Sequence, residues 1–326
     1  MDIKTTYMGL KLKNPIIVAS CGLSKSVDSI HKLVDAGAGC IVLKSLFEEQ
    51  VVAETREIEK YVGPSWHTEA LDYIRNYGIQ LGPTEYLNLI EDAKKVVSIP
   101  LIASLNCISS NWWIEYAKKL ENSGADGLEL NIAFVTNDPK RDSKEVESLY
   151  YDIVERIKQQ VTIPIAIKLG PYFSSLAHFT QGLVQRGVQG LVLFNRFYQV
   201  DFDIDKMELV PGSRYSSPDE ISLPIRWIAL LSAIMECDFS ASTGIHDGAG
   251  VIKLLLAGAK TVQVCSTLYQ NGLERIARIV EDLQAWMKKQ NFESLDSFRG
   301  KLSRLESDQP ERFDRLQYIK AIVGIE

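Results

Sequence analysis

This 326-residue sequence lacks a dense run of Lys or Arg, a long apolar run and closely spaced cysteines. Its net charge is −6 at pH 7, so it lacks the electrostatic attraction on which binding to nucleic acids and anionic membranes mostly depends. No stretch supplies the roughly 18 to 20 apolar residues that span a bilayer, and no signal-peptide pattern opens the chain. We therefore expect a cytoplasmic protein that binds a small molecule, with no nucleic-acid and no membrane partner.

The five cysteines have no C-x-x-C spacing of the kind that indicates a zinc site or a redox motif. We expect each to be a buried, reduced thiol, and we predict no metal. Hydrophobic residues make up 46% and charged residues 24% of the chain, which is typical of a folded protein without long disorder. The length suits one large domain, residues 1–326.

Short apolar segments bounded by Gly, Pro or polar residues predict eight strands, at 14–20, 40–46, 100–106, 127–133, 164–170, 190–196, 238–244 and 261–267. Apolar residues at helical spacing predict helices between and after them, at 27–36, 112–123, 143–160, 174–186, 223–236, 249–257 and 273–289. Strands that alternate with helices form parallel sheets joined by right-handed crossovers. Eight such units favour an α/β fold of the closed (β/α)8 TIM barrel type over an open doubly wound sheet.

The second and third strands are separated by an interval too long for one helix. We expect residues 47–83, rich in aromatic and turn residues, to form a lid or substrate loop ahead of a helix near 84–97. The segment before the first strand predicts a small hairpin that closes the barrel floor. The last residues, 291–326, predict a polar helical tail.

Active sites of α/β barrels form at the carboxyl ends of the strands. Every predicted strand ends polar, in Ser20, Lys44, Asn106, Asn131, Lys168, Asn195, Thr243 and Ser266. The alternation of side chains along a strand turns Lys44, Asn131 and Lys168 inward. An inward lysine is costly to desolvate unless an electron-rich ligand meets it, so this set predicts a polar, planar ligand.

Gly, Ser and Thr residues cluster where the last two strands lead into helices, in SASTGIHDGAG (240–250) and VCSTLYQNG (264–272). Unpaired N–H groups and the helix dipole favour an anion there, so we predict a phosphate near Thr243 and Ser266. A planar head near Lys44 and Lys168 joined to a phosphate describes FMN. Lys168 is assigned to the flavin N1/O2 edge, where it would stabilise the negative charge that accumulates on reduction.

The sequence resembles the dihydroorotate dehydrogenase family, particularly its soluble dimeric class, over nearly its full length. The likeness is carried by NPIIVASCG (14–22), IVLKSL (41–46), LELNIA (128–133), PIAIKLGPYF (164–173), LPIRW (223–227), STGIHDG (242–248), AGAKTVQVCSTLYQNG (257–272) and the tail FESLDSFRGKL (292–302). The resemblance implies a homodimeric FMN enzyme that oxidises dihydroorotate to orotate in pyrimidine biosynthesis.

The resemblance also implies roles for individual residues. The expected FMN contacts, which include the strand-end asparagines, are Ala19, Ser20, Cys21, Lys44, Ser45, Asn106, Asn131, Lys168, Asn195, Ser217, Thr243, Gly244, Cys265 and Ser266. The residues expected to frame the substrate are Lys44, Asn76, Asn131 and Asn195. Lys168 and Lys44 are the expected catalytic residues.

The substrate half departs from the family pattern. After the strand-four asparagine the family reads N-L-S-C-P-N, in which the Cys is the base; here 131–136 reads NIAFVT, and Phe134 cannot accept a proton. The lid motif N-S-M-G-L-P-N is reduced to NYGIQ (76–80), while Arg196 and Thr243 replace a Ser and a Gly. A positioned base contributes on the order of 10²- to 10⁴-fold, so we expect weak or no dihydroorotate turnover and consider another substrate.

Several alternatives stay open at this point. Tyr77, His67, Cys107 or Cys21 could replace the missing base. Phe134 is either a core residue that anchors its loop or an aromatic wall over the flavin. The function could instead be that of a Schiff-base lyase using Lys168 or Lys44, or of a flavin-binding module without turnover.

Overall fold

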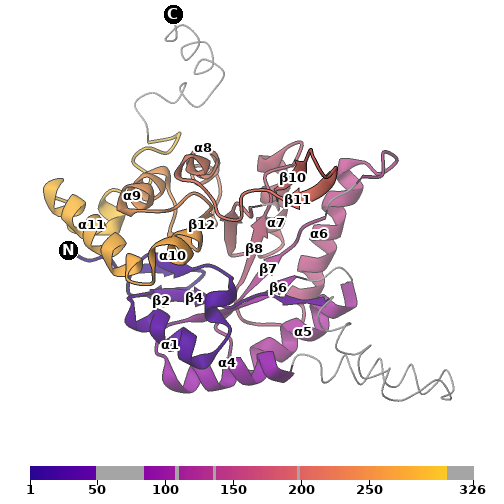
Figure 1. Ribbon diagram of the computed structural model, residues 1–326, viewed down its shortest axis with the longest axis horizontal. Coiled ribbons are helices and arrows are strands. Elements are labelled where there is room, and N and C mark those ends of the chain that lie inside the picture. The colour runs from indigo at the N-terminus through magenta and orange to yellow at the C-terminus, as the bar shows by residue number, and fades with distance from the viewer. Residues whose placement is uncertain (49–83, 107–109, 135–136, 197–198, 307–326) are drawn as a thin grey trace, which may run out of the picture.

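The structure, a computed structural model, describes residues 1–48, 84–106, 110–134, 137–196 and 199–306 (Figure 1). Its centre is a closed ring of parallel strands, in the order β3 (Ile16–Val18), β4 (Cys40–Val42), β6 (Leu101–Asn106), β7 (Gly127–Asn131), β8 (Ile165–Leu169), β9 (Gly190–Leu193), β12 (Asp238–Ser242) and β13 (Thr261–Val264). The ring closes because β13 pairs with β3, Val264 lying beside Val18. The predicted (β/α)8 TIM barrel is confirmed.

The helices surround the ring of strands (Figure 1). They are α1 (Val27–Asp35), α4 (Thr84–Val96), α5 (Ser110–Asn122), α6 (Ser143–Lys158), α7 (Leu176–Gln185), α8 (Ser222–Leu231) and α9 (Gly248–Ala257), with α10 (Ser266–Asn271) and α11 (Arg275–Lys289) after the last strand. In α6, Tyr150, Ile153 and Ile157 are buried at helical spacing, and the Asp142 side chain caps the first turn. Each helix thus follows from an apolar stripe that packs on the barrel.

A small hairpin closes the barrel floor, as the sequence predicts. Strands β1 (Thr5–Tyr7) and β2 (Leu10–Leu12) pair antiparallel. Tyr7, the last residue of β1, and Met8, in the turn after it, pack inside the barrel against Ile17 and Val42. The active end must therefore be the opposite one, where the strands end at their carboxyl termini.

The second barrel strand is interrupted. It ends as β4 at Val42 and resumes as the short β5 (Leu46–Phe47) beside β6. In the break, the Ser45 N–H donates to the Ser20 side chain at 2.8 Å and Lys44 is exposed. The predicted strands are longer than the observed ones because several of the polar residues at their ends lie in loops.

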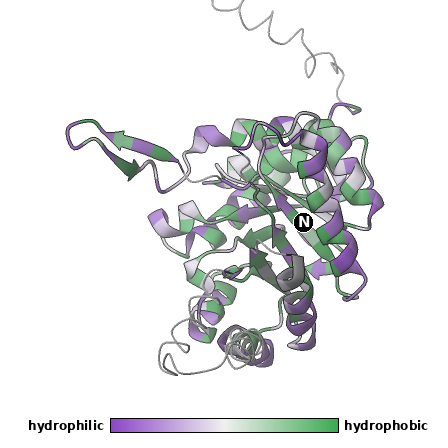
Figure 2. Ribbon diagram, turned by 90° about the vertical axis from the view of Figure 1, so that its right-hand side faces the viewer, coloured by the Kyte–Doolittle hydropathy of each residue, from purple (hydrophilic) through white to green (hydrophobic). Residues whose placement is uncertain are grey.

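A second hairpin, β10 (Val200–Asp203) and β11 (Glu208–Pro211), projects away from the barrel (Figure 2). The strand predictions do not include it. Its apolar side chains are exposed, Phe202 to 69% and Leu209 to 63%.

The predicted lid and tail are described only in part. Of the lid, residues 49–83 lie outside the described residues, so that assignment stays a prediction. Of the tail, the described part holds the short helix η3 (Leu295–Ser297), and residues 307–326 lie outside. Searching the described ranges for a helix with the length and apolarity needed to cross a bilayer yields none.

Candidate active site

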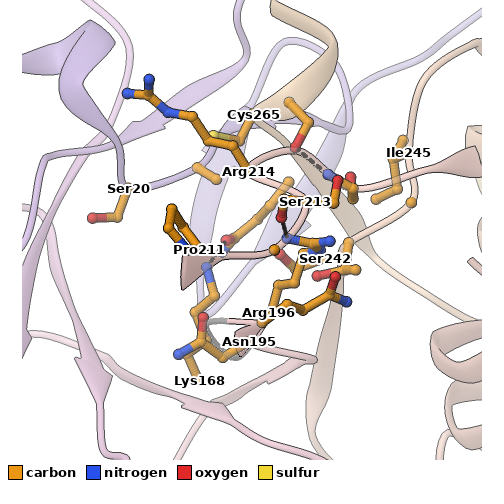
Figure 3. A pocket seen from close by; sticks show the side chains of 18 residues that line it. Ser20, Lys168, Asn195, Arg196, Pro211, Ser213, Arg214, Ser242, Ile245 and Cys265 are labelled. Carbon is orange, nitrogen blue, oxygen red and sulfur yellow. Dashed lines mark hydrogen bonds between the residues drawn. The ribbon is translucent and has the colours of Figure 1, made fainter. Parts of the chain in front are cut away.

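A cavity of about 720 Å³, here called the mouth cavity, lies at the carboxyl ends of β3, β8, β9, β12 and β13 (Figure 3). Its volume is within the range of about 300–1,000 Å³ that is typical of small-molecule and cofactor sites. The predicted site residues that line it are Ala19, Ser20, Lys168, Asn195, Thr243, Gly244, Cys265 and Ser266. Strand ends far apart in the sequence therefore meet in one place.

Lys168 comes from β8 and is only 7% exposed. Its Nζ lies 3.4 Å from Gln263 Oε1 and 3.9 Å from Glu129 Oε1, while Gln263 Nε2 donates to Glu129 Oε2 at 2.6 Å. Both contacts of the ammonium are long, and Glu129 Oε1 accepts no hydrogen bond. A buried cation that is held this loosely keeps N–H groups available for an acceptor in the cavity.

Two asparagines form an amide pair beside Lys168. Asn195 Nδ2 donates to Asn131 Oδ1 at 2.9 Å, and the Asn195 backbone N–H donates to Leu169 O at 2.7 Å. Asn195 lines the mouth cavity and also a neighbouring cavity of about 560 Å³. The pair leaves one amide oxygen and one NH₂ group free to meet a ligand.

Arg196 also lines both cavities. Its Nε donates to Glu220 Oε2 at 2.8 Å and its Nη1 donates to Ser213 O at 2.7 Å (Figure 3). Burial by itself would raise the pKa of Glu220, but the hydrogen bonds from Arg196 and from the Ser217 N–H outweigh it and lower that pKa. Arg196 is thus a fixed, ion-paired part of the wall.

The end of β12 has an unusual backbone. Thr243 and Gly244 both lie in the left-handed region, at φ 79° and φ 78°. A β-branched residue seldom adopts this conformation, and here the Thr243 hydroxyl is held by donation to Phe194 O at 3.0 Å. A Cβ on Gly244 would collide with the backbone of Ile221. Thr243 therefore keeps a glycine-like turn at the position where the resemblance implies a glycine.

Serines join the last two loops. Ser266 Oγ accepts from the Ser216 N–H at 3.0 Å, and Ser216 Oγ lies 3.2 Å from His246 Nε2. Ser216 is buried and lines the mouth cavity. The predicted Ser217 is exposed and does not line the cavity, because its backbone N–H donates to the Glu220 side chain in the following turn. Sequence reasoning did not select Ser216 or Gln263, although alternation along β13 would have identified Gln263 as inward-facing.

The other predicted residues lie off the lining of the mouth cavity. Cys21 and Asn106 are half-buried, Lys44 is exposed, and Ser45 Oγ links Ser20 Oγ at 2.9 Å to Ser104 Oγ at 2.8 Å. Their assignments, and that of Asn131 through its amide pair, stay predictions. Four further predicted residues lie outside the described part of the chain: Asn76, predicted to contact the substrate, and Tyr77, His67 and Cys107, considered as substitute bases.

Phe134 packs away from the mouth cavity. Its ring meets Tyr150 edge-on at 5.3 Å, and its backbone N–H donates to the Tyr150 hydroxyl at 3.3 Å. Tyr150 in turn packs against Phe173 and Phe179. Neither cavity described above is lined by Phe134. Of its two interpretations, the structure favours the loop anchor.

Comparisons with known proteins agree with this geometry. The sequence model of a family described as dihydroorotate dehydrogenase matches residues 2–287. The catalytic subunit of dihydroorotate dehydrogenase B (NAD(+)) from Thermoplasma volcanium is 27% identical over 92% of this chain and 98% of its own length.

Two further relatives carry different names. Dihydropyrimidine dehydrogenase (NADP(+)), chloroplastic, from Arabidopsis thaliana is 25% identical over 92% of this chain and 76% of its own length. Dihydroorotate dehydrogenase A (fumarate) from Limosilactobacillus reuteri is 26% identical over 88% of this chain and 94% of its own length. The motifs predicted this relationship: the chain belongs to the dihydroorotate dehydrogenase family, and it is a dehydrogenase that acts on CH–CH groups.

Proposed function

We propose that this protein is an FMN-dependent dehydrogenase that oxidises, or in reverse forms, a CH–CH bond beside a carbonyl in a cyclic amide. Dihydropyrimidines are this class of substrate, and dihydroorotate is one member. The observation that carries the proposal is the buried, loosely held Lys168 ammonium beside the Asn131–Asn195 amide pair at one cavity. Relatives named for dihydroorotate and for dihydropyrimidine support the substrate class.

The residues of the mouth cavity fit FMN. A polar ring edge would accept from Lys168, whose N–H groups are otherwise poorly used. The turn at Thr243–Gly244 and the linked Ser216 and Ser266 would hold the phosphate through N–H and O–H groups. FMN, when bound there, supplies the acceptor for a hydride.

The chain's own groups then divide the work. The Lys168 ammonium stabilises negative charge at its end of the cavity, where little water dilutes its effect. The free oxygen of Asn195 and the free NH₂ group of Asn131 offer an acceptor and a donor side by side, which complement the N–H and C=O of a cyclic amide. Their contacts would fix the orientation of the substrate ring.

A base for the proton on carbon is the weak part of the site. Among the described residues that line the mouth cavity there is no Asp, Glu or His, and Phe134 points into an aromatic cluster. We expect dihydroorotate oxidation to be slower, by on the order of 10²- to 10⁴-fold, than a positioned base would allow. Relatives named for NAD(+), NADP(+) and fumarate make these three the acceptors to test.

The test is anaerobic mixing of the yellow, FMN-loaded protein with dihydroorotate and with dihydrouracil while the flavin absorbance is recorded. We expect Phe134→Cys to bleach faster than the wild type, and the matched control Phe134→Leu, which lacks a thiol, to behave like the wild type. A protein that takes up no FMN would contradict the proposal. A flavin that neither compound bleaches in any of the three proteins would favour the flavin-binding module without turnover.

A homodimer and a cytoplasmic location, both expected from the sequence, belong to the same proposal. The exposed apolar face of the β10–β11 hairpin, formed by Val200, Phe202 and Leu209, supports a contact with a second copy. An isolated two-stranded hairpin is marginally stable in water, so a covering surface would stabilise it. Light scattering of the wild type should give twice 36.6 kDa, and a monomer mass would contradict the dimer.

A further inference from the structure

A pair of opposite charges lies inside the barrel, next to the mouth cavity. Among the described residues, two charged side chains are almost completely buried, Glu129 on β7 at 1% and Lys168 on β8 at 7% exposed. Barrel interiors are usually filled by branched apolar side chains, and charges taken out of water are costly. Because Lys168 lines the cavity, a pair kept at this cost indicates a role in the chemistry there.

Gln263 on β13, itself buried, bridges the two charges. Its Nε2 donates to Glu129 Oε2 at 2.6 Å, and its Oε1 accepts from Lys168 Nζ at 3.4 Å. The amide can bridge in this orientation only, because a carboxylate accepts hydrogen bonds and an ammonium donates them. The short bond is the one to the carboxylate, so Gln263 fixes Glu129 more firmly than it fixes Lys168.

Glu129 and Lys168 face each other without a direct hydrogen bond. Glu129 Oε1 lies 3.9 Å from Lys168 Nζ, and it accepts no hydrogen bond from the described residues. Their neighbours on the next strands are apolar, since Ala166 pairs with Glu129 and Val192 pairs with Lys168, and both pack with the floor hairpin. In so apolar a setting the carboxylate offsets a large part of the ammonium charge.

We propose that Glu129, held by Gln263, is a counter-charge that offsets part of the Lys168 charge and so lowers the reduction potential of the cofactor in the mouth cavity. The inference rests on the proposed FMN site. It makes Glu129 and Gln263 positioning residues, which act on the cofactor through Lys168. A lower potential makes the electrons taken from the substrate easier to pass on to an acceptor.

The sign of the effect follows from the charges. Reduction places negative charge at the ring edge assigned to Lys168, which a nearby cation favours and a nearby carboxylate opposes. A unit charge within about 10 Å, at an effective dielectric constant of about 20, changes an equilibrium constant by on the order of tenfold. Glu129→Gln removes the carboxylate charge at nearly the same side-chain shape, so it should raise the equilibrium constant for reduction.

Gln263→Met should act in the opposite direction. Methionine neither donates to Glu129 nor accepts from Lys168 as the amide does, so both charges lose their bridging partner. The carboxylate and the ammonium, 3.9 Å apart, should then close into a direct ion pair that turns N–H groups of Lys168 away from the cavity. Opposite shifts in two variants of one network distinguish a counter-charge from a general loss of stability.

The test is a redox titration of the FMN-loaded wild type and variants, followed by flavin absorbance. We expect an equilibrium constant for reduction at least about tenfold higher in Glu129→Gln, a potential about 30 mV more positive, and at least about threefold lower in Gln263→Met. The matched control is Thr261→Val, which removes a buried hydrogen bond to Ser240 on the same strand and should leave the potential unchanged. Sulfite, which adds to the flavin ring and leaves negative charge on it, should bind tighter in Glu129→Gln and weaker in Gln263→Met.

The outcomes separate this inference from the proposed function. A folded wild type that takes up no FMN would overturn both. FMN uptake with a potential that Glu129→Gln leaves unchanged or lowers would overturn the counter-charge alone. Should Glu129→Gln fail to fold, by circular dichroism, Gln263→Met decides by itself, and an unchanged or more positive potential in that variant overturns the inference.

Discussion

The two sides of the barrel mouth differ in how their side chains are placed. The side built by β8, β9, β12 and β13 carries Lys168, Asn195, Thr243 and Ser266 into one cavity. On the side built by β4, β5, β6 and β7, Lys44 is exposed and Phe134 is packed against Tyr150. The first side depends on strand ends and backbone turns, and the second on loops. We propose that the first side holds the cofactor, and we expect the substrate site to differ from the family pattern on the second side.

The comparison is tested most strongly with the two lysines. Lys168→Met should slow flavin reduction on the order of 10²- to 10³-fold, because it removes the charge at the buried end of the cavity. Lys44→Met, its matched control on the other side, should cost much less because Lys44 is exposed. Stopped-flow measurements on both variants check this, and equal losses would contradict the division.

Lys168→Met also leaves Glu129 buried without its cation, which costs about 3–5 kcal/mol in typical buried pairs. The double variant Glu129→Gln/Lys168→Met should recover most of that stability without recovering the rate. A double variant that recovers both would show that Lys168 acts only through folding.

The turn after β12 sharpens the comparison on the cofactor side. Gly244→Ala forces a side chain into the left-handed region and against the backbone of Ile221, so it should lower the free energy of unfolding by more than about 2 kcal/mol. Thr243→Gly should change it by less than about 1 kcal/mol, because relief of strain offsets the lost hydroxyl bond. Urea unfolding of both variants decides, and a neutral Gly244→Ala would contradict this account of the turn.

On the other side, Phe134→Ala should cost about 1–2 kcal/mol, less than the 3–5 kcal/mol typical of a fully buried Phe, since this ring is half-buried. Phe134→Leu should cost under about 1 kcal/mol. Thermal and urea unfolding measure both. If Phe134→Ala leaves stability unchanged but alters the flavin spectrum, the aromatic-wall interpretation would replace the loop anchor.

The smallest expected effect is a pH dependence at Glu220. Its pKa is lowered in the folded protein, so its contribution to stability is present above its ordinary pKa of about 4.3 and is lost as pH falls through the lowered value. Glu220→Gln should remove that dependence, by at most about 1 kcal/mol. Unfolding curves measured between pH 3 and pH 7 give the free energy of unfolding of both proteins as a function of pH. The same pH dependence in both would show that the Arg196–Glu220 pair contributes nothing.

Much of the fold was predictable because barrel strands are apolar runs between Gly or Pro signals. The β4–β5 break was not, since Leu43 to Ser45 read as a continuous strand. The β10–β11 hairpin had a signal that was overlooked: in VDFDID (200–205) apolar residues alternate with aspartates, which is the period of a strand.

The site was predictable where strand order fixed it and less so in loops. Ser216 rather than Ser217 lines the cavity because the turn at Pro218–Ile221 directs the second serine outward, a one-residue distinction that depends on backbone geometry. Ala19 and Cys265 line the same cavity because β13 closes onto β3, which no local spacing in the sequence reports.

The central claim is that the mouth cavity holds FMN. Titrating FMN-free protein with FMN, followed by the quenching of flavin fluorescence, tests it most directly. We predict saturation at one FMN per chain, with affinity weakened at least about tenfold by the folded Glu129→Gln/Lys168→Met variant and weakened less by Lys44→Met, whose side chain is exposed. No saturable uptake, or an affinity that the loss of Lys168 leaves unchanged, would contradict it.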